Sequence, residues 1–183
     1  HLEMCLPFKD WIIGVGLDSD EKDNPPIKFT EVFARARNEG FKLTMHCDVN
    51  QTDIVDHIWQ CLDDIQVDRI DHGINALEDE RLCAEIAKRG LGLTVCPVSN
   101  RFVVQSLTTK EIKSMLQKGM KATINSDDPG YFRAYLTDNF LALIEEAEFS
   151  QDEIRQLNAN AFETSWLSAA RKKYYLEQVN NFS

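Results

Sequence analysis

Residues 121–132 read KATINSDDPGYF, and this stretch decides the fold that we predict. A short β-prone run, Ala122 to Asn125, stops before two adjacent carboxylates, Asp127 and Asp128, and a helix-breaking Pro-Gly pair. Adjacent like charges repel each other, and they are tolerated mainly where a cation lies between them or where each has its own task. We therefore expect Asp127 to bind a metal ion and Asp128 to contact substrate. Because Asp before Pro commonly starts a turn, the same residues are also compatible with a turn alone.

The composition limits the classes of protein to consider. The chain has 183 residues, of which 43% are apolar, so residues 1–183 are predicted to form a single domain with one core. A net charge of −10 argues against nucleic acid or an anionic membrane as the main partner. We find no apolar run of the roughly 20 residues that span a bilayer and no secretory pattern in the first residues, and we expect a cytoplasmic protein. The five scattered cysteines form no Cys-x-x-Cys pair and are predicted to be reduced core residues.

Strand-like and helix-like stretches alternate along the chain. Gly40, Gly90 and Gly119 are predicted to end three of the helices. A capping box at Thr108-x-x-Glu111 is predicted to open the helix that ends at Gly119, and a second box at Ser150-x-x-Glu153 is predicted to open a later helix. The predicted strands cover residues 11–17, 41–45, 69–73, 91–95 and 122–125, and the helices between them cover residues 28–39, 52–64, 78–89 and 108–118.

This alternation predicts a parallel sheet covered by helices. Each predicted strand is followed by residues that can perform chemistry. An open doubly wound sheet concentrates its site at one switch point, whereas a barrel gathers the carboxyl ends of all its strands around one mouth. We therefore predict an α/β fold that is the C-terminal part, about strands four to eight, of a (β/α)8 TIM-type barrel. The strand-end residues are Asp18-Ser19, His46 to Asp48, His72, Ser99-Asn100 and Asp127-Asp128.

Two of the four histidines follow predicted strands. His46 and His72, together with Asp127, form a set of nitrogen and oxygen donors that suits Zn²⁺ or Fe²⁺. A hydrolytic metal site also keeps one position open for water. His57 lies in the middle of a predicted helix and is interpreted as a packing or surface residue. These residues favour a metal-dependent hydrolase.

Four motifs resemble the adenosine and adenine deaminase branch of the metal-dependent amidohydrolase barrels. They occur in family-like order and spacing on the predicted strands four, six, seven and eight, and the ordered set is far more specific than any one motif. A segment near the C-terminus, Asn160 to Leu167, is similar to the terminal helix of the family. The four motifs are Gly16 to Glu21, Arg69 to Gly73, Cys96 to Asn100 and Asn125 to Pro129.

The resemblance implies a role for each matching residue. His46 and Asp127 would be zinc ligands, and Asp127 would also accept a hydrogen bond from the attacking water. His72 would deprotonate that water as a general base. Asp128 would hold a purine ring nitrogen, and Ser19 would lie against the base. The implied reaction is the attack of a zinc-activated water at C6 of an aminopurine, with loss of the exocyclic amine.

Two departures from the family pattern matter. The family's first two ligands form a His-x-His pair, which these 183 residues lack, so we expect a complementary N-terminal part of the barrel as a partner. Relatives commonly read His-Ala-Gly-Glu where this chain reads His46-Cys47-Asp48-Val49. Val49 cannot donate a proton, and Asp48 is predicted to replace the usual acid. Its loop must then reshape, because adjacent residues of a strand point to opposite faces.

The resulting hypothesis is a hydrolytic deaminase that acts on adenine or an N6-substituted adenine. The turn from Leu17 to Glu21 looks more like the adenine branch than the adenosine branch, which favours a free base as substrate. Adenosine deaminase remains an alternative. A non-catalytic purine-binding protein of the deaminase type is a second alternative, because the usual acid is missing.

Overall fold

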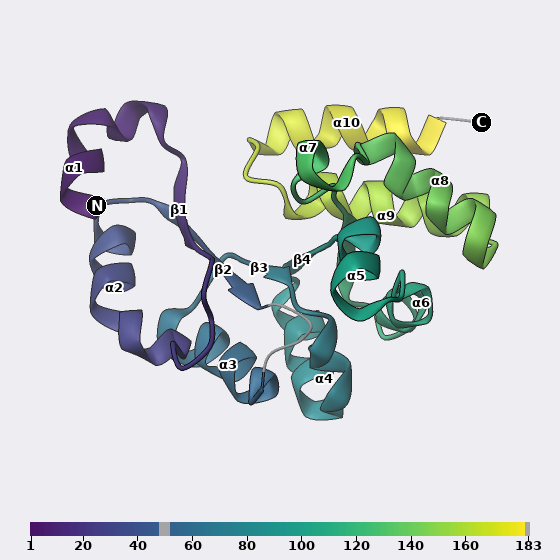
Figure 1. Ribbon diagram of the computed structural model, residues 1–183. Coiled ribbons are helices and arrows are strands. Elements are labelled where there is room, and N and C mark those ends of the chain that lie inside the picture. The colour runs from purple at the N-terminus through teal and green to yellow at the C-terminus, as the bar shows by residue number, and fades with distance from the viewer. Residues whose placement is uncertain (48–51, 182–183) are drawn as a thin grey trace.

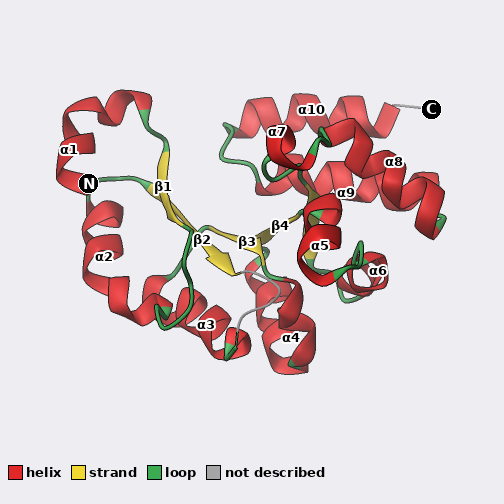
Figure 2. Cartoon of the chain, in the orientation of Figure 1, coloured by secondary structure: helices red, strands yellow, loops and turns green. Residues whose placement is uncertain are grey.

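The computed structural model describes residues 1–47 and 52–181. Its described strands form one parallel sheet in the order β1-β2-β3-β4-β5 (Figures 1 and 2). A doubly wound sheet changes its strand order at the switch point, and the described strands show no such change. Their sequential order is the one expected for part of a barrel. The strands are β1 (Gly14–Leu17), β2 (Lys42–Cys47), β3 (Arg69–His72), β4 (Gly92–Val95) and β5 (Lys121–Ile124).

Helices fill the connections between the strands. Figure 1 shows α2, α3 and α4 on the same side of the sheet and α8, α9 and α10 grouped together, and α9 packs against β5. Shorter turns of 3₁₀ helix occur at Leu6–Trp11, Pro26–Phe29 and Ile74–Glu78, and a π-helical turn, Cys61–Ile65, continues α3. The α-helices are α1 (Leu2–Cys5), α2 (Thr30–Asn38), α3 (Ile54–Gln60), α4 (Glu80–Arg89), α5 (Pro97–Val104), α6 (Thr109–Gln117), α7 (Pro129–Phe132), α8 (Leu136–Ala147), α9 (Gln151–Thr164) and α10 (Ala169–Asn181).

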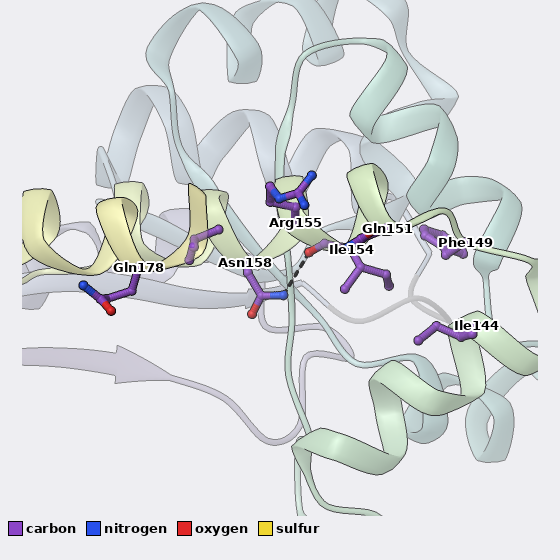
Figure 3. Close-up of a pocket in the computed structure, with 8 residues that line it drawn as sticks. Ile144, Phe149, Gln151, Ile154, Arg155, Asn158 and Gln178 are labelled. Carbon is purple, nitrogen blue, oxygen red and sulfur yellow. Dashed lines mark hydrogen bonds between the residues drawn. The ribbon is translucent and has the colours of Figure 1, made fainter. Parts of the chain in front are cut away.

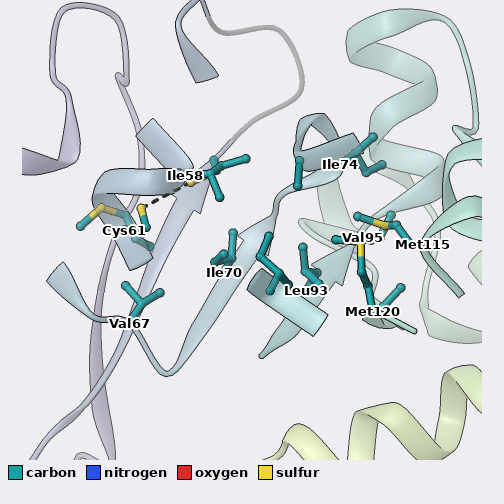
Figure 4. Close-up of a cluster of buried hydrophobic side chains, with 14 of the residues drawn as sticks. Ile58, Cys61, Val67, Ile70, Ile74, Leu93, Val95, Met115 and Met120 are labelled. Carbon is teal, nitrogen blue, oxygen red and sulfur yellow. Dashed lines mark hydrogen bonds between the residues drawn. The ribbon is translucent and has the colours of Figure 1, made fainter. Parts of the chain in front are cut away.

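The hydrophobic core lies between the sheet and these helices. Strand residues such as Ile70, Leu93 and Val95 meet helix residues such as Ile58 and Met115 (Figure 4). Burial alternates along the central strands, as the two-residue period of a strand requires. The other face of the sheet therefore carries polar side chains, including those of Thr44, His46 and Asp71.

The segment after α9 closes the sheet at the amino ends of its strands. A Cβ atom on Gly14 would lie 2.6 Å from the Trp166 ring, and a Cβ atom on Gly92 would lie 2.6 Å from Thr164 Oγ1. Both glycines open a strand, and the missing side chain lets the terminal segment approach the backbone. The segment Asn160 to Leu167, which is similar to the terminal helix of the family, thus covers the amino ends of these strands. We call this segment the floor of the sheet.

The first two strands differ from their predicted bounds. The apolar run that begins at Trp11 was predicted to be extended, but Trp11 ends a 3₁₀ turn and is 91% exposed, and β1 begins only at Gly14. The second strand is longer than predicted and includes His46. The strand alternation therefore directs this imidazole to the polar face.

The helix ends test the capping predictions. The predicted glycine stops are confirmed, because Gly40, Gly90 and Gly119 have φ values of 93°, 65° and 72°. The capping box at Ser150 is confirmed by reciprocal hydrogen bonds with Glu153. The box at Thr108 was wrong, because its hydroxyl accepts from Asn100 Nδ2 and donates to the Leu107 carbonyl instead of capping α6.

Within the described residues, no helix combines the length and the apolar character needed to cross a membrane. The single-domain organisation over residues 1–183 and the cytoplasmic location stay predictions.

Candidate active site

A cavity of about 760 Å³ opens at the carboxyl ends of the strands. It brings together five of the six predicted site residues, namely Ser19, His46, His72, Asp127 and Asp128. The sixth, Asp48, lies outside the described residues. Among the described residues, the lining consists of Asp18, Ser19, His46, Arg69, Asp71, His72, Thr94, Cys96, Ile124, Asn125, Ser126, Asp127, Asp128 and Leu136.

The two strand-end histidines meet inside this cavity. Their Nε2 atoms are 2.7 Å apart, and the ring planes are nearly perpendicular, at 80°. His72 Nε2 is also 3.9 Å from Asp127 Oδ2. His72 therefore lies within reach of both residues that the sequence proposes as metal ligands.

Glu21 meets the opposite side of the His46 ring. Its carboxylate contacts Nδ1, so Nε2 of His46 is the nitrogen that faces His72. A carboxylate on the distal nitrogen is the usual partner of a metal-binding histidine, because it fixes the orientation and the tautomer of the ring. The acidic turn after β1 was the only signal for this contact in the sequence.

Three residues that line the cavity have left-handed backbone conformations. The φ values are 86° for Ser19, 60° for His72 and 55° for Asp127. This region is unfavourable for residues with a side chain, and such strain concentrates at functional sites. The chain therefore turns sharply at three strand ends, and each turn presents a polar side chain to the same cavity.

Cys96 is a site residue that sequence reasoning missed. His72, Cys96 and Asp127 each offer one possible ligand atom, and these atoms lie within 4.8 Å of one another. The sequence predicted Cys96 to be a core residue. Cys96 directly follows β4, however, and a position directly after a strand was the reason for selecting the other site residues. By contrast, Ser99 and Asn100 were predicted at the mouth but are buried in α5. That prediction was wrong because the chain turns into a helix at Pro97.

A smaller cavity of about 260 Å³ adjoins the site and reaches His57. Its lining also includes Glu21 and His46, so His57 lies closer to the candidate site than its position in the middle of a helix suggested. We assign His57 no catalytic role, since the main cavity does not include it.

A third cavity, of about 580 Å³, lies between α8, α9 and α10 (Figure 3). Apolar side chains, including Ile144, Phe149 and Ile154, make up much of its wall. The amide of Asn158 donates to the Ile154 carbonyl at 2.9 Å. None of the described residues that line it is a histidine, a cysteine or a carboxylate. The strand-end cavity is therefore the candidate active site.

Comparison with known proteins agrees with this geometry. The family model described as adenosine deaminase matches residues 2–182. The chain belongs to the adenosine deaminase family. An adenine deaminase of Rhodospirillum rubrum is 47% identical over 173 residues, which are 93% of this chain and 51% of the relative. The crystal structure of an adenine deaminase from Arthrobacter aurescens matches with a TM-score of 0.91 and 38% identity, over 98% of this chain and 55% of that protein.

A zinc-bound amidohydrolase from Burkholderia ambifaria matches with a TM-score of 0.81 over 97% of this chain and 53% of that protein. Its sequence identity is only 22%, so this match supports the fold alone. The chain thus spans about half the length of the proteins that it matches. Together with the sequential parallel sheet, these matches confirm the predicted fold, the C-terminal part of a (β/α)8 barrel.

Proposed function

We propose that this chain carries the C-terminal half of the active site of a zinc-dependent hydrolytic deaminase. The substrate would be an adenine-type purine base, either adenine or an N6-substituted adenine. The observation that carries the proposal is the meeting of His46, His72 and Asp127 in one strand-end cavity. The relatives named adenine deaminase, at 38% to 47% identity, favour adenine over adenosine.

The cavity contains donors of the types that bind zinc, and among the described residues the ligand atoms of His72, Cys96 and Asp127 lie within 4.8 Å of one another. His46 Nε2 and the Asp127 carboxylate would hold the zinc ion, because nitrogen and oxygen donors of this kind are common zinc ligands. When bound, zinc lowers the pKa of a coordinated water and so supplies the nucleophile at neutral pH.

The protein side chains would orient and deprotonate the attacking water. Glu21 holds the His46 ring so that Nε2 faces the cavity. Asp127 would accept a hydrogen bond from the water, and His72, with its Nε2 3.9 Å from Asp127 Oδ2, would take the water's proton as a general base. Asp128 would hold a ring nitrogen of the purine, and Ser19 would lie against the base. We retain Asp48 as the proposed proton donor to the ring.

We also propose a complementary N-terminal part of the barrel as the partner of this half. Within the described sheet, β1 and β5 each pair with one neighbour only. Apolar side chains next to β1 are exposed, with Trp11 at 91% and Ile13 at 62%. A sheet edge flanked by exposed apolar residues favours a further layer of protein, which the remaining barrel strands would supply.

The test uses the intact protein, meaning this chain together with the part that supplies the remaining strands. Adenine, N6-methyladenine and adenosine are assayed side by side, and the metal content is measured. We expect release of the amine from a free base, and we expect His72→Ala to keep zinc while losing about 10²- to 10⁴-fold in kcat.

His57→Gln is the matched control and should retain the parental rate. Loss of zinc from His72→Ala would make His72 a ligand, not a base. A protein that binds the purine without turnover or stoichiometric zinc would support the non-catalytic alternative.

A further inference from the structure

Asp71 lies in the middle strand of the sheet and connects three strands. One carboxylate oxygen accepts from Thr44 Oγ1 of β2 at 2.6 Å, and the other accepts from Thr94 Oγ1 of β4 at 2.9 Å. The strand register places Asp71 beside His46 on one side and Thr94 on the other. Because each oxygen is bound by a different neighbour, the carboxylate holds β2, β3 and β4 together at the level of the site.

Arg69 supports this carboxylate from the amino end of β3. Its Nε lies 3.5 Å from Asp71 Oδ1, which is within ion-pair range but outside hydrogen-bond geometry. Its guanidinium carbon lies 4.1 Å from the centre of the Trp166 ring, a cation–π distance. Trp166 in turn packs against Gly14 at the amino edge. The Asp71 carboxylate is therefore held by hydrogen bonds from both neighbouring strands and by an ion pair with Arg69.

The turn that directs His72 begins directly after Asp71. His72 and Gly73 have consecutive positive φ values, 60° and 74°, and the Gly73 N–H donates to the Cys47 carbonyl at 3.2 Å. A shift of Asp71 would move the start of this turn. The His72 imidazole would then move relative to His46, which lies on the neighbouring strand.

We propose that Asp71 is a positioning residue, which sets the separation of His46 and His72 by tying β2, β3 and β4 together. Its expected effect on the rate rests on the proposed function, whereas its effect on metal affinity does not require turnover. Each carboxylate oxygen of Asp71 binds one threonine hydroxyl of a neighbouring strand, and it is through these strands that Asp71 acts on the histidines.

Asp71→Asn and Asp71→Ala separate position from charge in the intact protein. Asparagine keeps the shape and can bond both hydroxyls, because its amide offers an acceptor and a donor and a hydroxyl can act as either. Asp71→Asn should therefore keep kcat within about tenfold, whereas Asp71→Ala should lose about 10²-fold with little change in KM, since a misplacement of about 1 Å costs that much. Competition against a chelator should show zinc affinity about tenfold weaker in Asp71→Ala and nearly parental in Asp71→Asn.

The double variant Thr44→Val/Thr94→Val provides a second route to the same question. It removes both hydroxyl donors but leaves the charge of Asp71. Like Asp71→Ala, it should lower both kcat and zinc affinity. It therefore tests the positioning role of Asp71 even if Asp71→Ala does not fold. Thr30→Val is the matched control, because this hydroxyl at the start of α2 donates to the Ile27 carbonyl at 2.9 Å and does not line the cavity. It should leave both quantities at their parental values.

Equal losses in Asp71→Asn and Asp71→Ala would overturn the proposal and assign the effect to charge. Parental kcat and zinc affinity in the double threonine variant would also overturn it. If the intact protein deaminated no aminopurine, the proposed function would fail, but the zinc competition would still decide the role of Asp71.

Discussion

Replacing Glu21 with alanine removes the carboxylate that meets Nδ1 of His46. The pair is largely sheltered from solvent, since the Glu21 side chain is 11% exposed and that of His46 is 23% exposed. A hydrogen bond to a charged group contributes about 1.5–3 kcal/mol in such settings, and about 1.4 kcal/mol corresponds to tenfold in affinity. We therefore expect Glu21→Ala to weaken zinc binding by about 10- to 100-fold, the range typical for residues that orient a metal ligand.

The measurement is a chelator competition on the intact protein, with thermal unfolding of the zinc-free form as a check on folding. Glu21→Gln keeps an oxygen that can accept the Nδ1 proton and should fall between the parent and Glu21→Ala. Glu145→Ala, an exposed glutamate of α8, is the matched control and should bind zinc like the parent. Zinc affinity in Glu21→Ala within about threefold of the parent would refute the orienting role of this carboxylate.

Two further predictions concern packing and assembly. Gly92→Ala should destabilise the intact protein by about 1–3 kcal/mol in urea unfolding, because the added Cβ would lie 2.6 Å from Thr164 Oγ1. Gly130→Ala, where a Cβ meets open space, is its control, and equal stability of the two variants would contradict the packing described for the floor. The 183-residue chain alone should self-associate, because Trp11 and Tyr131 are 91% and 80% exposed. A single monomeric species in sedimentation, together with one cooperative thermal transition, would show that the surfaces around Trp11 and Tyr131 need no partner.

The order of the strands could be predicted because its signals are local. A short apolar run, a polar strand end and a glycine stop all lie within a few residues of one another, and most predicted elements occur within a few residues of their predicted bounds. The start of β1 was the main failure. Trp11 to Ile13 are apolar, but an apolar run this short does not distinguish a strand from a turn of helix.

The candidate site was predictable only in part, for a related reason. His46, His72 and Asp127 were found because each lies at a strand end, which is a property of its own neighbourhood. Glu21 was missed because it contacts a histidine 25 residues away, on the next strand. Asp71 was likewise missed, because its two threonine partners are 27 and 23 residues away in the sequence. Such contacts depend on the register of the strands, which no local pattern specifies.

The floor formed by Thr164 and Trp166 has a consequence for the order of events during synthesis. Gly14 and Gly92, which it covers, leave the ribosome well before it does. All five strands are therefore synthesised while their amino edge still lacks this cover. Arg69 gains its aromatic neighbour only when Trp166 arrives. During synthesis the amino edge of the sheet thus cannot be covered before Trp166 has emerged, and until then this edge is exposed to water.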